Sequence, residues 1–125
     1  MMQNKLMPIY ENIGGFTCLL ELGKWTPTSI NMMLSKASQY SDPSDRLHWI
    51  MQNFIGVRFE FESMAPILPE GVLRVRLESM DCITYIYNML ALCKAKNFNE
   101  YVFNLYNIRY IPITLQDAKI GECRV

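Results

Sequence analysis

The sequence predicts a helix-rich α+β domain with a helix at its centre. Several segments repeat apolar residues at three- and four-residue spacing, which is typical of amphipathic helices. Residues 57–61 and 73–77 instead alternate between apolar and charged side chains, as half-buried strands do. The run from 82 to 95 is apolar almost all round and therefore predicts a buried helix between the other elements.

The composition fits one globular domain over residues 1–125. Of the 125 residues, 50% are hydrophobic and 19% are charged, which is enough to form a core. Lys plus Arg and Asp plus Glu each number 12, so there is no basic excess for binding nucleic acid. No stretch is apolar enough to cross a bilayer, and Pro8 and Glu11 interrupt any secretion signal. The chain as written is expected in the cytosol, although relatives could be exported.

The cysteines and the single histidine predict neither a metal site nor a cofactor. Cys18, Cys82, Cys93 and Cys123 form no CxxC pair, and His48 is the only histidine. Cys82 and Cys93 would lie about 16 Å apart along one helix, too far for a disulfide. Reduced thiols are therefore expected.

The first half of the chain predicts one strand and two helices. The strand covers residues 16–22. One helix starts at Thr26 and another at Asp42, because each is a good N-cap followed by proline, and the second ends at Gly56. Their apolar faces are Ile30, Met33, Leu34 and Ala37 in the first helix, and Leu47, Ile50, Met51 and Phe54 in the second.

The second half predicts two strands, two helices and a tail. The strands 57–61 and 73–77 are expected to pair across an intervening proline-containing loop, with their charged residues outward. After the central helix comes a last helix, over residues 97–110, and a short edge strand at 111–115. The single domain is thus divided into an ill-defined start, a core portion and a divergent tail, which are residues 1–25, 26–110 and 111–125.

Cys82 falls on the first turn of the central helix. Unpaired backbone N–H groups there carry partial positive charge and favour a thiolate, which is the nucleophilic form. A free cysteine more often serves only as a packing residue, so both interpretations stand. Asp81 also has two interpretations: it could cap the helix, or its negative charge could oppose formation of a thiolate at Cys82. The helix has a larger-residue face of Cys82, Tyr85, Ile86, Met89, Leu90 and Cys93, and a smaller-residue face of Thr84, Asn88, Ala91 and Ala95.

A series of short elements in this half resembles the N-acetylmuramoyl-L-alanine-amidase-like family, a bacterial group of cysteine-peptidase-like proteins related to the NlpC and papain fold. The resembling elements are Phe54-Ile55-Gly56, Pro69 to Leu77, Asp81-Cys82-Ile83-Thr84-Tyr85-Ile86-Tyr87, Leu90-Ala91-Leu92 and Ile108-Arg109-Tyr110. They follow one another at compatible spacing and cover a little under half of the chain.

The resemblance implies a fold, a nucleophile and a substrate. Cys82 would be the nucleophile, with Asp81, Thr84 and Tyr85 as supporting residues. Its helix would lie against an antiparallel sheet whose later strands carry the catalytic histidine. The substrate would be an amide bond in a peptidoglycan stem peptide, with backbone N–H groups at the helix start stabilising the oxyanion.

The sequence also departs from the family pattern. Tyr87 stands where the family has an acidic residue, and no histidine follows Tyr110. His48 precedes the cysteine, on the flank of an apolar stripe, so it is a poor candidate for the base, which stays unassigned. The chain therefore resembles the front portion of such an enzyme, with a truncated sheet and weak or no activity.

A non-catalytic binding or scaffold module derived from the same fold is the alternative. An incomplete sheet leaves apolar surface that favours association, with a second copy or with a complementing chain. Tyr85, Tyr87, Tyr101 and Tyr106 would suit such a contact surface, or else belong to the core.

Overall fold

The computed structural model describes residues 9–61 and 65–109. Within them, helices and two small sheets confirm the α+β class. In chain order the elements are β1 (Ile9–Ile13), β2 (Phe16–Glu21), α1 (Pro27–Ala37), α2 (Pro43–Gln52), β3 (Arg58–Phe59), β4 (Val72–Arg76), β5 (Ser79–Met80), α3 (Cys82–Cys93) and α4 (Phe98–Arg109).

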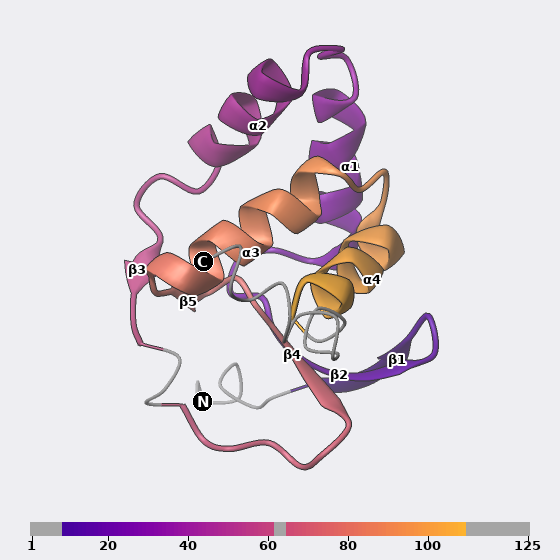
Figure 1. Cartoon of the computed structure of the whole chain (residues 1–125), viewed down its shortest axis with the longest axis vertical. Helices are drawn as coiled ribbons and strands as arrows, with labels where there is room; N and C mark the ends of the chain where they lie inside the picture. Colours follow the sequence, from indigo (N-terminus) through magenta and orange to yellow (C-terminus); the bar gives the residue numbers. More distant parts are fainter. Residues whose placement is uncertain (1–8, 62–64, 110–125) are drawn as a thin grey trace, which may run out of the picture.

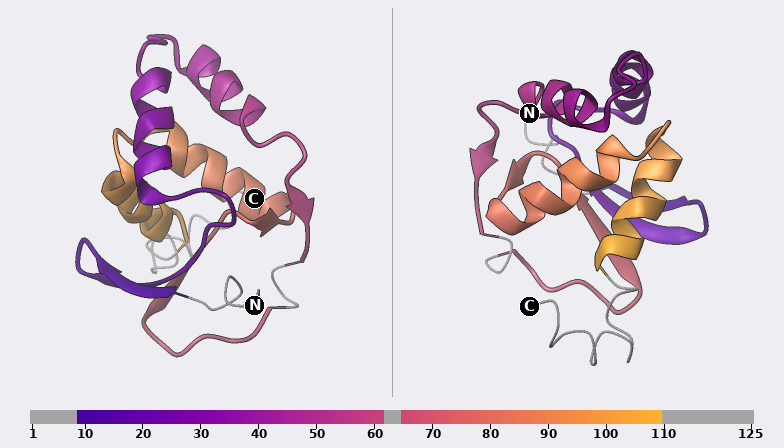
Figure 2. Two further views of the ribbon diagram at one scale, coloured as in Figure 1. Left: turned by 180° about the vertical axis from the view of Figure 1, so that it is seen from behind. Right: turned by 45° about the horizontal axis from the view of Figure 1, so that its top comes forward.

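The helices and the larger sheet occupy different parts of the molecule. Helices α1 and α2 lie at the end of the molecule opposite the β1–β2 hairpin (Figure 1). Helix α3 lies between these two helices and the hairpin. Two further views show the same arrangement (Figure 2). Buried side chains of β2, β4 and the helices form one continuous core, so α3 is held from several sides.

The larger sheet has the order β1-β2-β4. Strand β2 confirms the predicted strand at 16–22, while β1 was not predicted. β1 and β2 are antiparallel, whereas β2 and β4 are parallel and pair Leu20 with Val75. This sheet is therefore mixed, not antiparallel as the family resemblance implied.

The predicted pairing of segment 57–61 with segment 73–77 is wrong. β4 pairs with β2, and β3 pairs in parallel with the short β5. The prediction that the charged residues of segment 73–77 face outward is also wrong, because Arg74 is only 8% exposed. Its guanidinium donates to Glu21 Oε1 at 2.7 Å, so a partner from β2 replaces the water that a surface arginine would have.

The structure confirms the predicted starts of α1 and α2. The Thr26 hydroxyl accepts the Ser29 N–H at 3.0 Å, so Thr26 is the N-cap of α1. α2 ends at Gln52, before the predicted Gly56, and Gly56 has a φ of +89° in the following turn. Met51, expected in the buried stripe, is 36% exposed.

Helix α3 starts at Cys82 as predicted, but it is not buried all round. Its buried residues are Thr84, Asn88, Met89, Ala91 and Leu92. The opposite side exposes Ile83 and Ile86, each 54%, and Leu90, 41%. The smaller-residue side is covered because small residues allow close approach of α4 and of the end of β4.

Two features discussed from the sequence, the strand predicted at 111–115 and the thiol of Cys123, lie outside the described residues. The division of the domain into three portions stays a prediction. Among the described helices, none is long and apolar enough to cross a membrane.

Candidate functional site

Cys82 is the first residue of α3, and its side chain is exposed. The preceding strand β5 ends at Met80, so only Asp81 separates the strand from the helix. This strand-to-helix junction presents the thiol to solvent beside the first N–H groups of the helix.

Asp81 and Thr84 form a capping box around the cysteine. Asp81 Oδ1 accepts the Thr84 N–H at 2.9 Å, and Thr84 Oγ1 accepts the Asp81 N–H at 2.9 Å. The capping role predicted as one option for Asp81 is therefore confirmed. Because Thr84 N–H is bound by the cap, the N–H groups of Cys82 and Ile83 are the first-turn donors available to a ligand.

Tyr85, the other predicted supporting residue, is a packing residue. Its ring is half-buried against the hydrophobic core, and its N–H makes the first helical bond, to Asp81 O at 2.9 Å. Tyr85 therefore helps to hold the start of the helix in place.

The other described cysteines are in different environments. Cys18 is fully buried on β2, and burial raises the pKa of its thiol. Cys93 is half-buried at the far end of α3, with its Sγ 3.8 Å from Pro43 O. Neither thiol lies at a helix start, so Cys82 differs from both in position and exposure.

His48 is an exposed residue of α2. The contact between Cys93 and Pro43 brings the start of α2 to the end of α3. His48 is only five residues, about 8 Å, into α2, whereas Cys82 is about 16 Å from Cys93 along α3. The structure thus does not bring His48 beside Cys82 in the way that a catalytic base requires.

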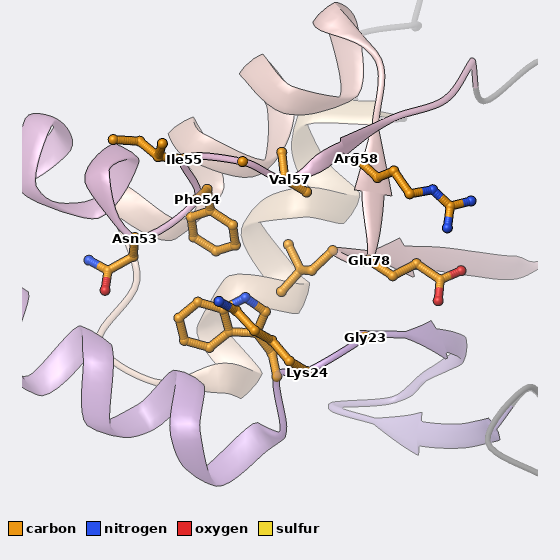
Figure 3. Close-up of a pocket in the computed structure, with 11 residues that line it drawn as sticks. Gly23, Lys24, Asn53, Phe54, Ile55, Val57, Arg58 and Glu78 are labelled. Atoms are coloured by element: carbon orange, nitrogen blue, oxygen red, sulfur yellow. The ribbon is translucent and has the colours of Figure 1, made fainter. Parts of the chain in front are cut away.

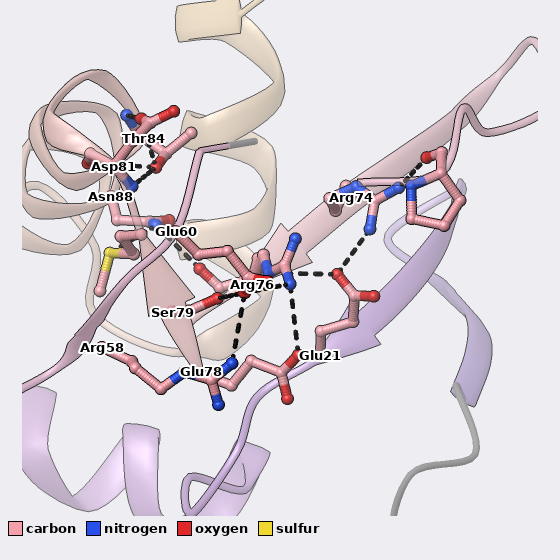
Figure 4. A network of polar contacts seen from close by, with 12 residues as sticks. Glu21, Arg58, Glu60, Arg74, Arg76, Glu78, Ser79, Asp81, Thr84 and Asn88 are labelled. Atoms are coloured by element: carbon pink, nitrogen blue, oxygen red, sulfur yellow. Dashed lines mark hydrogen bonds and ion pairs between the residues drawn. The ribbon is translucent and has the colours of Figure 1, made fainter. Parts of the chain in front are cut away.

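A network of charged side chains lies beneath the β5–α3 junction (Figure 4). Arg76 is at its centre, with Glu60 Oε1 at 3.1 Å, Glu78 Oε2 at 3.6 Å and Glu21 Oε1 at 3.7 Å. Arg74 extends it through its bond to Glu21. This network was not predicted from the sequence, although the alternating charges of residues 57–61 and 73–77 were a signal for it.

Ser79 connects this network to β5. Its hydroxyl donates to Glu60 Oε1 at 2.8 Å, and Asn88 of α3 donates to Arg76 O at 3.0 Å. The Ser79 bond and the nearby Arg76 hold the pKa of the Glu60 carboxyl below its usual value. The residues before and after Cys82 are thus both fixed to the end of β4.

The described residues contain no group of three or more His, Cys, Asp or Glu side chains that could hold a metal ion.

These residues define an α+β domain that presents a cysteine thiol at the N-terminus of a helix. A model of the N-acetylmuramoyl-L-alanine amidase-like family matches residues 50–116, more than half of the chain. The chain therefore belongs to this family. The match starts within α2, after His48, and includes the whole β5–α3 junction. No curated protein and no solved structure matches the chain.

Proposed function

We propose that Cys82 is the nucleophile of an amidase that cleaves an amide bond of a peptidoglycan stem peptide. The observation that carries this proposal is the exposed thiol on the first residue of a capped helix, within the region that matches the family. A relationship to the NlpC and papain fold belongs to the same proposal.

In the proposed reaction, Cys82 Sγ attacks the amide carbonyl carbon as a thiolate. The carbonyl oxygen becomes an oxyanion, which the N–H groups of Cys82 and Ile83 stabilise. The amine leaves with a proton as the intermediate collapses to a thioester, and water then hydrolyses the thioester to release the acid. Asp81 and Thr84 are positioning residues, since their capping box fixes the helix start.

The base that takes the thiol proton is not assigned, and we propose that it comes from another chain or from a further part of a longer gene product. General acid–base help is worth typically about 10²–10⁴ in rate, so the chain by itself should be weakly active or inactive. Thiol reactivity is therefore a more sensitive first test than hydrolysis.

Iodoacetamide is expected to modify Cys82 about tenfold faster than Cys93 near neutral pH, because Cys82 is exposed at the positive end of α3 and Cys93 lies at the negative end. Peptide mapping by mass spectrometry at timed intervals measures both rates in one sample. Thr84→Val removes one half of the capping box and should reduce the ratio of the Cys82 rate to the Cys93 rate. Equal, slow modification of both thiols would count against a nucleophilic Cys82.

Hydrolysis itself is tested with purified muropeptides, by mass spectrometry of the released amine. Any slow release by the natural chain should disappear in Cys82→Ser and persist in Cys93→Ser, the matched control. Release that survives Cys82→Ser would remove Cys82 from the reaction.

The exposed side of α3 favours a second candidate, a non-catalytic interaction module. Ile83, Ile86 and Leu90 lie on one helical stripe and leave apolar surface in contact with water. The partner in this proposal is a second copy of the chain, because a single helix stripe can contact itself across a two-fold axis.

Sedimentation velocity at increasing concentration tests this module. The natural chain and Cys82→Ser should associate alike, whereas Ile86→Glu should stay monomeric because it puts a charge at the centre of the stripe. Met32→Glu, at a 60% exposed position of α1, is the control and should associate like the natural chain. A natural chain that is monomeric at every concentration would eliminate this candidate.

A further inference from the structure

A cavity of about 360 Å³ lies where three loops meet, apart from the Cys82 thiol (Figure 3). The loops follow β2, α2 and β4, and they contribute residues 23–25, 53–58 and 77–78. No residue of α3 lines the cavity, so it is distinct from the β5–α3 junction. Its volume falls within the range of small-molecule sites.

The walls of this cavity are fixed by the backbone. Because β2 and β4 are parallel, their carboxyl ends lie together, and the loops that follow them are neighbours. Glu21 O accepts the N–H groups of Leu77 and Glu78, at 2.9 and 3.1 Å. Gly23 has a φ of +64°, and a Cβ there would lie 2.9 Å from Glu78 Cβ. The close approach of the two loops therefore requires glycine, and these backbone contacts hold the cavity wall in place.

Two aromatic rings give the cavity an apolar part. Trp25 and Phe54 are stacked with ring centroids 5.0 Å apart, and Phe54 is almost fully buried while Trp25 is half-buried. The side chains of Val57 and Leu77 also line this part. An apolar or aromatic group of a ligand can lie against these surfaces and lose its contact with water.

Charged groups line the rest of the cavity, two cations and one carboxylate. Arg58 and Glu78 lie beside one another in Figure 3, away from the Phe54 ring. Both already have ion-pair partners in the network, since Arg58 is 3.6 Å from Glu60 and Glu78 is 3.6 Å from Arg76. Lys24 differs, because its Nζ lies over the Trp25 ring, 5.7 Å from the centroid. An ammonium group thus stands next to the aromatic surface.

We infer that this cavity binds a small carboxylate that also carries an apolar or aromatic group, such as the C-terminal end of a peptide. The apolar group lies against Trp25 and Phe54, and the carboxylate faces the Lys24 ammonium, with Arg58 as the second cation at the rim. The inference does not depend on the proposed reaction of Cys82.

Tryptophan fluorescence gives a direct test, because one of the two tryptophans is in the cavity wall. The other, Trp49, packs at a tilt against Tyr40, with ring centroids 6.0 Å apart, outside the cavity. Trp49→Phe therefore leaves Trp25 as the one reporting tryptophan. The probes are N-acetyl-phenylalanine and its amide, which differ only in the carboxylate. The acid should give a saturable change in emission and bind about tenfold more tightly than the amide, as expected for one charge-assisted hydrogen bond.

Variants test whether Lys24 causes the preference for the acid over the amide. Lys24→Gln, at an exposed position, should bring the affinities for acid and amide to within about twofold, whereas Lys36→Gln on α1 should keep the difference. Arg58→Gln should reduce the preference partly. Equal binding of acid and amide by the parent, no response to either probe, or a preference that survives Lys24→Gln would each overturn the inference.

Discussion

Replacing Glu21 with alanine is expected to lower the free energy of unfolding by about 3–5 kcal/mol, because it leaves a buried arginine without its counter-ion. The Arg74 side chain is 7% exposed and Glu21 is 18% exposed, with 2.7 Å between Arg74 Nη1 and Glu21 Oε1. Arg74 also donates to Pro66 O, which cannot neutralise its charge. Urea unfolding followed by circular dichroism measures the loss.

Glu78→Ala provides the matched control. It removes the same charge from an ion pair with Arg76, but Glu78 is 44% exposed and water can replace it. Its expected cost is below about 1 kcal/mol. The double variant Glu21→Leu with Arg74→Met should recover most of the lost stability, because an apolar pair has no charge to desolvate. A cost of Glu21→Ala close to that of Glu78→Ala would mean that Arg74 is solvated after all.

Helix starts could be predicted from the sequence because their signals are local. The N-cap of α1, Thr26, bonds to Ser29, and the N-cap of α3, Asp81, bonds to Thr84. Each bond joins residues three positions apart, so residue types and spacing are sufficient to indicate it. This is why the sequence located Cys82 correctly at the start of a helix.

Strand pairing could not be predicted in the same way. The bond between Arg74 and Glu21 joins residues 53 positions apart, and nothing near Arg74 in the sequence indicates it. A strand with alternating arginines is normally half-exposed, so the pattern favoured a solvent-facing β4. The distant carboxylate makes burial of Arg74 possible, and it belongs to β2, the strand with which β4 pairs.

The cavity next to Trp25 could not be predicted for a similar reason. Its three loops are separated by some thirty and twenty residues in the sequence, and two of them are neighbours because β2 and β4 are parallel. Phe54 and Gly56 were noted as part of the family resemblance, but their role in a cavity depends on Trp25, which comes from outside the matched region.

Asn88 connects α3 by hydrogen bonds to the end of β4 and to α4. It is 3% exposed, its Nδ2 donates to Arg76 O at 3.0 Å, and its Oδ1 accepts the Tyr101 hydroxyl at 2.6 Å. Tyr101 is fully buried on α4, and burial raises the pKa of its hydroxyl. One amide thus satisfies a strand carbonyl and a buried hydroxyl.

Asn88→Leu is therefore expected to cost about 3 kcal/mol of unfolding free energy, since it leaves both of these groups without a partner while keeping a side chain branched at Cγ with the same number of heavy atoms. Asn99→Leu, at an exposed position of α4, should cost less than about 0.5 kcal/mol. Urea unfolding of the two variants measures the difference.

Tyr101→Phe separates the hydrogen bond from packing. By itself it should cost about 1–2 kcal/mol, because Asn88 Oδ1 loses its donor. Combined with Asn88→Leu it should add almost nothing, because the leucine has already removed the acceptor and phenylalanine removes the unpaired hydroxyl. Additive costs would show that the two side chains stabilise α3 independently, and the attachment of the Cys82 helix would then depend on its apolar contacts with α4.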